Sequence, residues 1–393
     1  MAKTLSFIQL SKFYLLLSGL WPFKISDNFL VDKIYRIYTL CQICYYLCVI
    51  FGLLVNLVIL IIRFDQPQRI IGDINLFIIV FECCLKVVIF QIGKVPFMLN
   101  QITQFEDSME ASGDAEVKDY YAKDAIYCRR INVIQSIATI IACASFAQDS
   151  VVTFITSDDM SVFKDNPFMH DLWYPFNRED YIYLVICIAF ICDMQGLVCN
   201  AACQTTLLCL MIYARTRLKI LQIRLRKFDK IAVEEYEGDV VRAVKDLIAE
   251  HQYLINFVKS LNDRTQHVLL LEFMLNSLCL ASGTSQFIII DTTSGWLATV
   301  FLNLYVIVQI FILSWHANEI SVEGLAVSDA IAASQWQKQS KEVQKLLIIM
   351  MMRAQKPIGL TAGPFFRMTN STAVQTMKVA YSYASIMTQN MPE

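Results

Sequence analysis

Charged residues are scarce in this sequence. They make up 17% of its 393 residues, whereas soluble domains have about a quarter. Hydrophobic residues reach 56%, and the mean hydropathy is +0.48. No run of lysine and arginine is typical of a nucleic-acid-binding arm. These scarcities exclude a soluble globular protein and a nucleic-acid partner, and they predict a polytopic membrane protein.

Motifs for catalysis and for bound cofactors are also absent. The four histidines, His170, His251, His267 and His316, are scattered without the spacing of metal ligands. No nucleotide-binding loop, hydrolase motif or zinc-protease motif occurs. We therefore expect neither an enzyme nor a site for a metal or a cofactor. Twelve of the 13 cysteines fall inside apolar spans and Cys128 directly precedes one, so no disulfide framework is predicted.

Long apolar runs are what the sequence does contain. Six spans are clear and a seventh is weaker; their bounds are 37–62, 71–92, 131–155, 181–213, 268–290, 296–315 and 371–390. They predict an all-α fold with seven transmembrane helices. The run at 345–352 is too short to cross a hydrocarbon core of about 30 Å. Residues 4–23 are predicted to form an amphipathic helix at the membrane surface rather than a cleavable signal peptide.

The positive charges are distributed asymmetrically between the two sides of this arrangement. With the N-terminus in the cytoplasm, 27 of the 33 lysines and arginines fall in cytoplasmic segments and four fall outside. This bias places the N-terminus inside and the C-terminus outside, which is opposite to a G-protein-coupled receptor. The chain then divides into four parts: a cytoplasmic segment at 1–36, transmembrane helices 1–6 at 37–315, a cytoplasmic segment at 316–368, and helix 7 with a short extracellular end at 369–393.

The fourth, fifth and sixth helices are predicted to continue into the cytoplasm. Residues 181–227 can form one helix, and residues 240–267 keep a helical pattern that leads into the fifth span. We expect the extensions at 214–267 to pack with residues 343–355 as a compact helical base.

The charged residues Glu82, Lys86 and Asp193 lie inside apolar spans and need partners, because lipid cannot solvate them. Glu82 and Lys86 are four residues apart, so they can pair along one helix face. Asp193 lies near mid-bilayer and is predicted to find a donor on another helix. We interpret all three as structural in the first place.

The outer halves of the second to sixth spans combine large rings with small residues. This mixture leaves room between helices for a small, neutral, mostly apolar molecule, although ordinary helix packing gives the same pattern. The candidate ligand-binding residues are Phe77, Phe81, Cys143, Phe146, Ala147, Tyr181, Tyr183, Leu184, Ser282, Gln286, Phe287 and Trp296.

The last span carries a continuous polar stripe. At 100° per residue, six of its polar residues fall within about 80° of arc. They are Ser371, Gln375, Lys378, Ser382, Ser385 and Gln389. Such a stripe must face water or polar groups, because lipid cannot satisfy it. It predicts either a cavity within one bundle or a pore shared by several subunits, with Ile386 at its border.

Several motifs resemble those of the insect odorant receptors. The segments NEISVEGLAVSDAIAASQW (318–336), KLLIIMMMRAQKPIGLTAGPFF (345–366) and VAYSYASIMTQ (379–389) are similar to the family's last quarter. LWYPFN (172–177) is similar to the motif that opens the family's fourth helix. The chain departs from the family at Ser314-Trp315-His316-Ala317, where Cys-Tyr-x-Gly is frequent.

The resemblance implies a ligand-gated, non-selective cation channel in the plasma membrane of olfactory neurons. Such channels are tetramers with a central pore lined by the seventh helix, and their cytoplasmic helices form an anchor domain. It implies that a small volatile odorant binds in the outer half of the bundle. Matching the final helix places Ile386, Gln389 and Asn390 at the gate, with Ser382 and Ser385 on the pore side.

The resemblance also bears on which kind of subunit this chain is. The family's shared co-receptor has a much longer segment between its fourth and fifth helices than residues 214–267 provide. The chain is therefore predicted to be an odorant-tuning subunit whose partner is the co-receptor. The alternatives are a gustatory receptor of the sister family, whose last helix ends differently, and a G-protein-coupled receptor, which the charge asymmetry disfavours.

Overall fold

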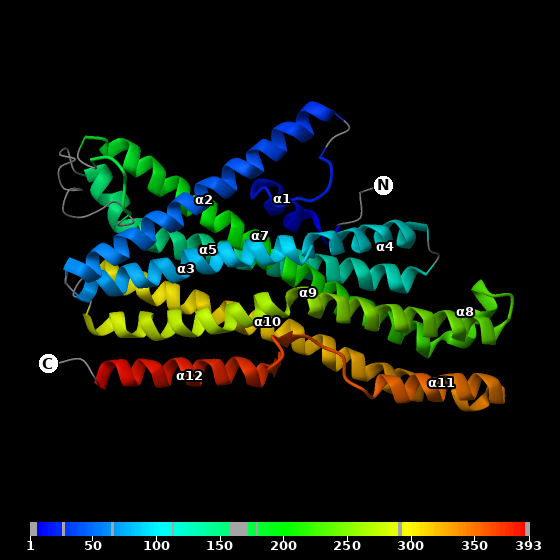
Figure 1. Cartoon of the computed structure of the whole chain (residues 1–393). Helices are drawn as coiled ribbons and strands as arrows, with labels where there is room; N and C mark the ends of the chain where they lie inside the picture. Colours follow the sequence, from blue (N-terminus) through cyan, green and yellow to red (C-terminus); the bar gives the residue numbers. More distant parts are fainter. Residues whose placement is uncertain are drawn as a thin grey trace.

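The computed structural model describes residues 6–25, 28–63, 67–111, 114–156, 172–177, 180–289 and 293–389. Long helices dominate this part of the chain (Figure 1). The seven that match the predicted spans are α2 (Phe29–Arg63), α3 (Pro67–Ile92), α5 (Ala115–Thr156), α7 (Ile182–Arg226), α9 (Val240–Ile289), α10 (Thr293–Ala332) and α12 (Asn370–Gln389). The shorter helices are α1 (Gln9–Leu17), η1 (Val95–Met98), α4 (Leu99–Ala111), α8 (Phe228–Glu235), η2 (Trp336–Lys338) and α11 (Lys341–Ala354). The prediction of an all-α polytopic membrane protein is confirmed.

Within the described residues, four helices are long and apolar enough to cross a membrane. They are α2, α7, α9 and α10. A bent pair, Leu76–Ile92 with Val95–Met109, passes the same criterion as a fifth and bends by 52°. α12 is not in this set because its polar stripe lowers its hydropathy.

Several helices are much longer than a bilayer requires. α7 has 45 residues, or roughly 70 Å at 1.5 Å per residue. α7, α9 and α10 extend beyond their apolar spans as predicted, and α11 packs on α9 and α10 where the base was expected. α5 also extends, beginning at Ala115 rather than near 131. Its charged first half has low hydropathy, so a search for apolar spans did not find it.

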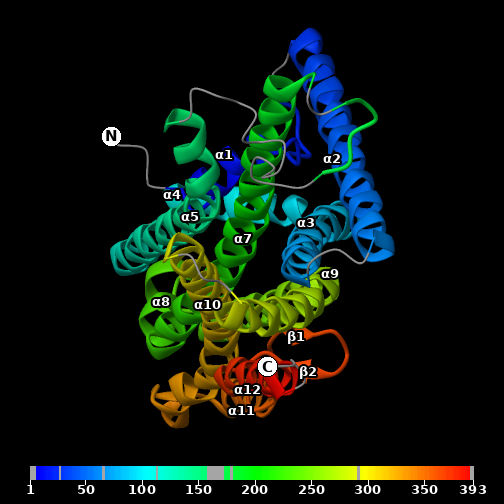
Figure 2. The same ribbon diagram turned by 90° about the vertical axis from the view of Figure 1, so that its left-hand side faces the viewer.

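α7 forms the centre of the molecule and packs against α1, α3, α5, α9 and α10 (Figure 2). From Cys199 to Leu225 almost every α7 side chain is buried. A helix that is apolar all round is stable only when other elements surround it. α1 packs on α7 too, and Ser11 Oγ donates to the Thr205 carbonyl at 2.9 Å. One face of the predicted surface helix, with the fully buried Leu15, therefore belongs to the protein core.

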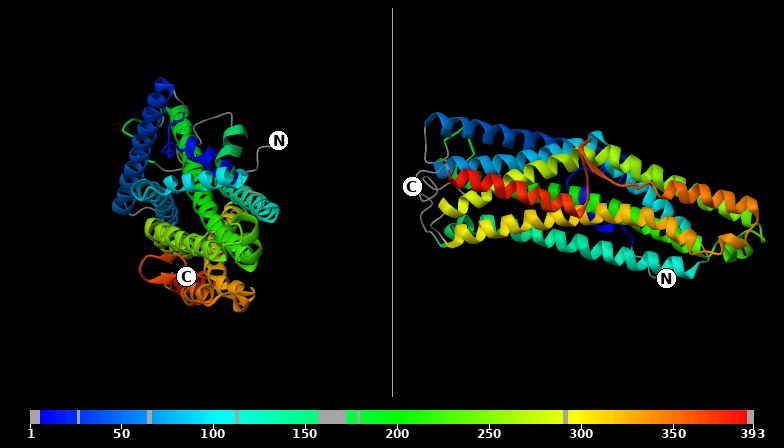
Figure 3. Two further views of the ribbon diagram at one scale, coloured as in Figure 1. Left: turned by 90° about the vertical axis from the view of Figure 1, so that its right-hand side faces the viewer. Right: turned by 90° about the horizontal axis from the view of Figure 1, so that it is seen from below.

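α12 lies along the edge of the bundle against α9 and α10 (Figure 3). A short antiparallel hairpin, β1 (Thr361–Ala362) with β2 (Phe366–Arg367), lies between α11 and α12. The hairpin is fixed to α9, because the Gly363 N–H donates to the Gln266 carbonyl at 2.9 Å. The sequence did not predict these strands, which are too short for an alternating pattern.

Candidate functional site

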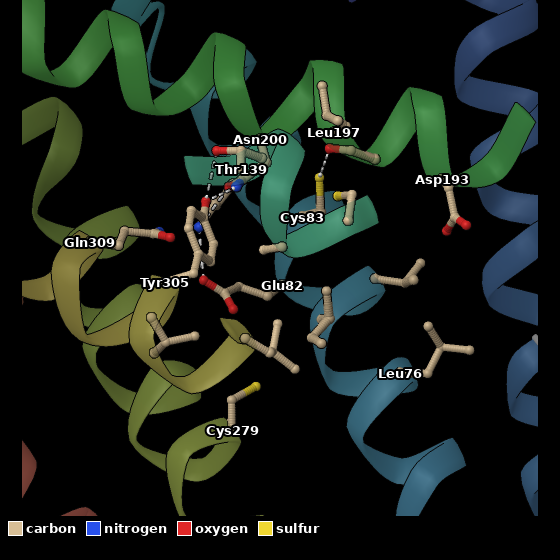
Figure 4. A pocket seen from close by; sticks show the side chains of 18 of the residues that line it. Leu76, Glu82, Cys83, Thr139, Asp193, Leu197, Asn200, Cys279, Tyr305 and Gln309 are labelled. Atoms are coloured by element: carbon tan, nitrogen blue, oxygen red, sulfur yellow. Dashed lines mark hydrogen bonds and ion pairs between the residues drawn. The ribbon is translucent and has the colours of Figure 1, made fainter. Parts of the chain in front are cut away.

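A cavity of about 150 Å³ lies among α3, α5, α7, α9 and α10, with Tyr46 of α2 at its side (Figure 4). A cavity of about this size is large enough for benzene. Small residues create the space: Ala142 lines the α5 side, and Gly196 lines the α7 side close to the Tyr46 hydroxyl. The site therefore suits a compact molecule.

Apolar side chains form most of the cavity wall. Leu76 and Val80 come from α3, Cys143 comes from α5, and Leu302 and Val306 come from α10. These groups offer dispersion contacts but no strong hydrogen bond. The shape of the cavity and the polar groups at one side of it must therefore orient a ligand.

Charged and amide groups form the floor of the cavity. The Lys86 ammonium lies 2.8 Å from Glu82 Oε1 and 3.0 Å from Glu272 Oε1. It also donates to Asn200 Oδ1 at 3.3 Å. The lysine side chain is 3% exposed and that of Glu272 is fully buried. The predicted pair of Glu82 and Lys86 is confirmed, and the third member, Glu272, was missed although it is also an acid within an apolar span.

Further hydrogen bonds surround this triad of Glu82, Lys86 and Glu272. The amides of Gln204 and Gln309 donate to Glu272 Oε1. The Tyr305 hydroxyl, which Figure 4 shows beside Asn200, accepts from the Asn200 amide at 2.7 Å. Among the described residues, Glu272 Oε2 and Gln204 Oε1 have no hydrogen-bond partner. Neither side chain lines the cavity itself, so both acceptors lie behind its wall.

The electrostatic balance of the site is negative. Glu82, Asp193 and Lys86 line the cavity, and Glu272 lies directly behind Lys86. The site thus holds three carboxylates and one ammonium. Asp193 projects from α7 as Figure 4 shows, and its expected donor on another helix stays a prediction. In a medium of low dielectric constant this balance opposes an anionic ligand.

Of the predicted ligand-binding residues, Cys143 lines this cavity. Phe77 and Phe81 stack on each other, with ring centroids 5.6 Å apart, without lining it. Ala147 is half-buried on α5, and Ser282 is buried on α9; neither lines the cavity.

The remaining predicted residues lie nearer the loops. The exposed ones are Tyr181, Tyr183, Leu184 and Trp296. The side chains of Phe146, Gln286 and Phe287 are outside the described part of the structure. Ligand contact at all these positions stays a prediction. Hydropathy gives the depth of a residue along a helix but not the helix rotation, which decides whether a side chain reaches a cavity.

On α12 the described members of the polar stripe point away from the protein's own bundle. Ser371, Gln375, Lys378 and Ser382 are exposed. The opposite face is buried, with Ala373 and Ala380 against the bundle formed by α9 and α10. Ser385 is half-buried. The side chains of Ile386 and Gln389, and all of Asn390, are outside the described residues.

Comparison with known proteins gives the family. A model of the family described as 7tm odorant receptor matches residues 66–381. Odorant receptor 10 of Aedes albopictus is 26% identical over 177 residues, which are 45% of this chain and 47% of the relative. Odorant receptor 22b of Drosophila melanogaster is 21% identical over 251 residues, 63% of this chain and 62% of the relative. The alignments thus span about half or somewhat more of these relatives.

The fold is also found among solved structures. The insect olfactory receptor OR5 from Machilis hrabei matches with a TM-score of 0.81 at 16% identity, covering 97% of both chains. The structure of that receptor in complex with eugenol also matches with a TM-score of 0.81, covering 98% of this chain and 99% of the other. Together with the family model, which covers most of the sequence, these matches decide between the alternatives left open above: the chain is a member of the insect odorant receptor family.

Proposed function

We propose that this chain is the odorant-tuning subunit of a ligand-gated, non-selective cation channel. In this proposal it assembles with the family's co-receptor in a heterotetramer in the plasma membrane of olfactory neurons. Its N-terminus is cytoplasmic and its C-terminus is extracellular. The family membership supports the receptor role, and the asymmetric distribution of lysine and arginine supports the orientation.

The odorant binds in the cavity that Cys143 lines. The observation that carries this assignment is the combination of apolar walls with a single polar floor. It favours a small neutral molecule with one hydrogen-bonding group, and it opposes carboxylate-bearing odorants. A receptor of the same fold has been solved with eugenol. We expect neutral ring compounds to activate the channel and their carboxylate analogues to be inactive at the same concentration.

The permeant cations pass along α12. The exposed polar stripe supports a pore shared by several subunits rather than a cavity inside one bundle, because its side chains face away from α9 and α10. Ile386, Gln389 and Asn390 are then proposed to form the gate, and Ser382 and Ser385 to lie on the path of the ions. α12 is joined to the anchor by the hairpin that is fixed to α9.

The cavity assignment is tested by filling the cavity. Cells that express this chain with the co-receptor are first screened with an odorant panel to identify an agonist. Cys143→Trp should then raise the half-maximal agonist concentration at least about tenfold, because the indole occupies the cavity. Cys41→Trp, at an exposed cysteine of α2, makes the same exchange away from the cavity and should leave sensitivity within about twofold.

Currents evoked by an agonist of the co-receptor show whether the variants fold and assemble. These currents should be unchanged in both variants. Equal odorant sensitivity of Cys143→Trp and wild type would contradict the assignment. In that case Tyr183→Ala and Trp296→Ala, at the exposed outer rings, test the second candidate location of the site.

A further inference from the structure

A second hollow, of about 500 Å³, lies apart from the ligand cavity. Its walls are residues 19–24, the first turns of α2, and the junction between α3 and η1. These segments flank the apolar spans, so the hollow lies at the depth of the lipid headgroups. Figure 1 shows α2 diverging from α3 toward this end. Nothing in the proposed odorant binding uses this region.

Positive charges from three separate segments line the hollow. Lys24 precedes α2, Arg36 lies in α2, and Lys94 lies between α3 and η1. Among the described residues that line it, Asp32 is the one acid, and its Oδ2 lies 3.2 Å from Arg36 Nη2. The guanidinium side chain remains 77% exposed, so this pair only weakly satisfies it. The hollow carries an excess of two positive charges and suits an anion.

Specific contacts fix the backbone segments that carry these charges. Lys94 adopts a left-handed conformation with φ 51°, which is strained for a residue with a side chain. Arg264 of α9 stabilises this turn, because its Nη1 donates to the Gly93 carbonyl at 2.7 Å and to the Lys94 carbonyl at 3.1 Å. On the opposite wall, the Trp21 backbone N–H donates to the Tyr35 hydroxyl at 3.1 Å.

An apolar groove continues from the hollow between α2 and α3. The hollow and the groove share Gly19, Leu20, Thr39 and Gln91 as lining residues. Beyond them the groove is lined mainly by apolar side chains, among them Ile43, Leu47, Val87 and Val88, and it reaches Tyr46. Leu47 and Val88 are exposed apolar side chains at its mouth, as expected where a span meets lipid. A cationic hollow joined to an apolar groove matches a molecule with an anionic head and a hydrocarbon tail.

We propose that this composite site binds one anionic phospholipid. Lys24, Arg36 and Lys94 hold the phosphate, and part of one acyl chain lies in the groove of about 90 Å³ along Ile43 and Val87. The proposal rests on the cytoplasmic orientation of the N-terminus, which places the hollow at the anionic leaflet. Because Tyr46 borders both the groove and the ligand cavity, the acyl chain reaches the wall of the odorant site.

Native mass spectrometry of the full-length chain in detergent tests the proposal. Phosphatidylglycerol and phosphatidylcholine with identical acyl chains are the probes. Wild type should bind phosphatidylglycerol at least about tenfold more tightly. The triple variant Lys24→Gln, Arg36→Gln, Lys94→Gln should lose about tenfold to a hundredfold of that affinity, since each interfacial cation contributes about a factor of five.

The matched control removes three lysines that are exposed and lie outside the hollow: Lys33→Gln, Lys230→Gln, Lys341→Gln. It should bind phosphatidylglycerol as wild type does. Equal affinity of the lining triple variant and this control would overturn the proposal. Thermal melting of each variant without added lipid shows that the comparison is made between folded proteins.

Two further measurements separate a lipid from a free phosphate. Ile43→Trp, which fills the groove, should weaken binding of both phospholipids at least about fivefold. Glycerol 3-phosphate, which lacks a tail, should bind at least about a hundredfold more weakly than phosphatidylglycerol. If it binds as tightly as the lipid, or if Ile43→Trp binds lipid as wild type does, the groove holds no acyl chain and the proposal fails. Unlike the cavity experiment, none of these readouts depends on odorant currents.

Discussion

At the residue scale, the Lys86 ammonium is a charge that is costly to bury. It lies inside the bundle between Glu82 and Glu272, where water cannot solvate it. A buried ion pair contributes little net stability over an apolar pair, but removing one partner leaves an uncompensated charge. The triad therefore makes the packing of α3 against α7 and α9 depend on charge balance.

Replacement of this lysine should be severely destabilising. Lys86→Met leaves two buried carboxylates without a cation and should cost about 3–5 kcal/mol. Glu272→Gln should cost less, because it leaves Glu82 paired with Lys86. The control is Lys123→Met, which breaks an exposed pair with Asp119 and should cost under about 1 kcal/mol. Melting temperatures of the purified proteins rank the three variants, and equal melting of Lys86→Met and Lys123→Met would contradict the role of the triad.

His251 makes the packing of α9 with α11 sensitive to acid. Burial in α9 lowers the pKa of His251 to about 4, and Arg353 of α11 contributes in the same direction. In the unfolded chain the His251 imidazole binds a proton near pH 6.5. In the folded chain this imidazole stays neutral until about pH 4. Stability is therefore lost as the pH falls from about 6.5 toward 4.

The histidine contribution can be isolated by a neutral replacement. Acidification from pH 7.5 to pH 5.5 should lower the stability of wild type by on the order of 1 kcal/mol. His251→Gln should melt at a temperature that changes less between these two pH values. A wild-type pH dependence retained in full by His251→Gln would show that another group is responsible.

Only some residues of the site could be predicted from the sequence. The pair of Glu82 and Lys86 followed from its spacing on one helix, because such a pair is local in sequence. Glu272 comes from a helix far along the chain, and its contact with Lys86 depends on how α3 packs against α9. Cys143 lines the cavity, whereas Tyr183 and Trp296 are exposed, because helix rotation is set by tertiary packing. Ligand contact at these three positions stays a prediction.

At the scale of elements, the hairpin before α12 fixes where that helix begins relative to α9. Gly363 forms its turn with φ 58°, a conformation that disfavours side chains. A Cβ at this position would lie 2.8 Å from Leu270 Cδ2 of α9. The turn thus requires glycine for its backbone conformation and for its close approach to α9.

A comparison of two glycines separates these two requirements. Gly238 also has a positive φ, of 87°, but a Cβ added there would meet open space. Gly238→Ala should therefore cost only the conformational strain of about 1 kcal/mol. Gly363→Ala adds a steric conflict and should cost about 1 kcal/mol more. Melting of both variants measures the difference, and equal destabilisation would mean that Leu270 moves away freely.

The helices were predicted well wherever apolar residues recur with helical spacing along the whole element. The extensions of α7 and α9 beyond their apolar spans were predicted because the helical pattern does not break where the spans end. The early start of α5 was missed because residues 115–130 are too charged for an apolar span. The strands β1 and β2 were missed because each has only two residues and pairs through backbone contacts alone.

At the scale of the whole molecule, three regions are linked by shared helices. α7, α9 and α10 line the cavity and continue into long extensions, and α11 packs on those of α9 and α10. α12 lies against α9 and α10, so a change at the cavity can reach the proposed pore through the same two helices. The family itself was recognisable from sequence, because its motifs cluster in the last quarter that builds this connection.

The central claim is that odorant binding in this chain opens a pore lined by its last helix. The most direct measurement uses Ser382→Cys, on the exposed stripe, in channels assembled with the wild-type co-receptor. A cationic thiol reagent applied from outside during odorant exposure should reduce the current by at least about half. Ala380→Cys, on the buried opposite face, and wild type should keep their currents. If Ser382→Cys is labelled but conducts the odorant-evoked current unchanged, α12 does not line the pore and the account is wrong.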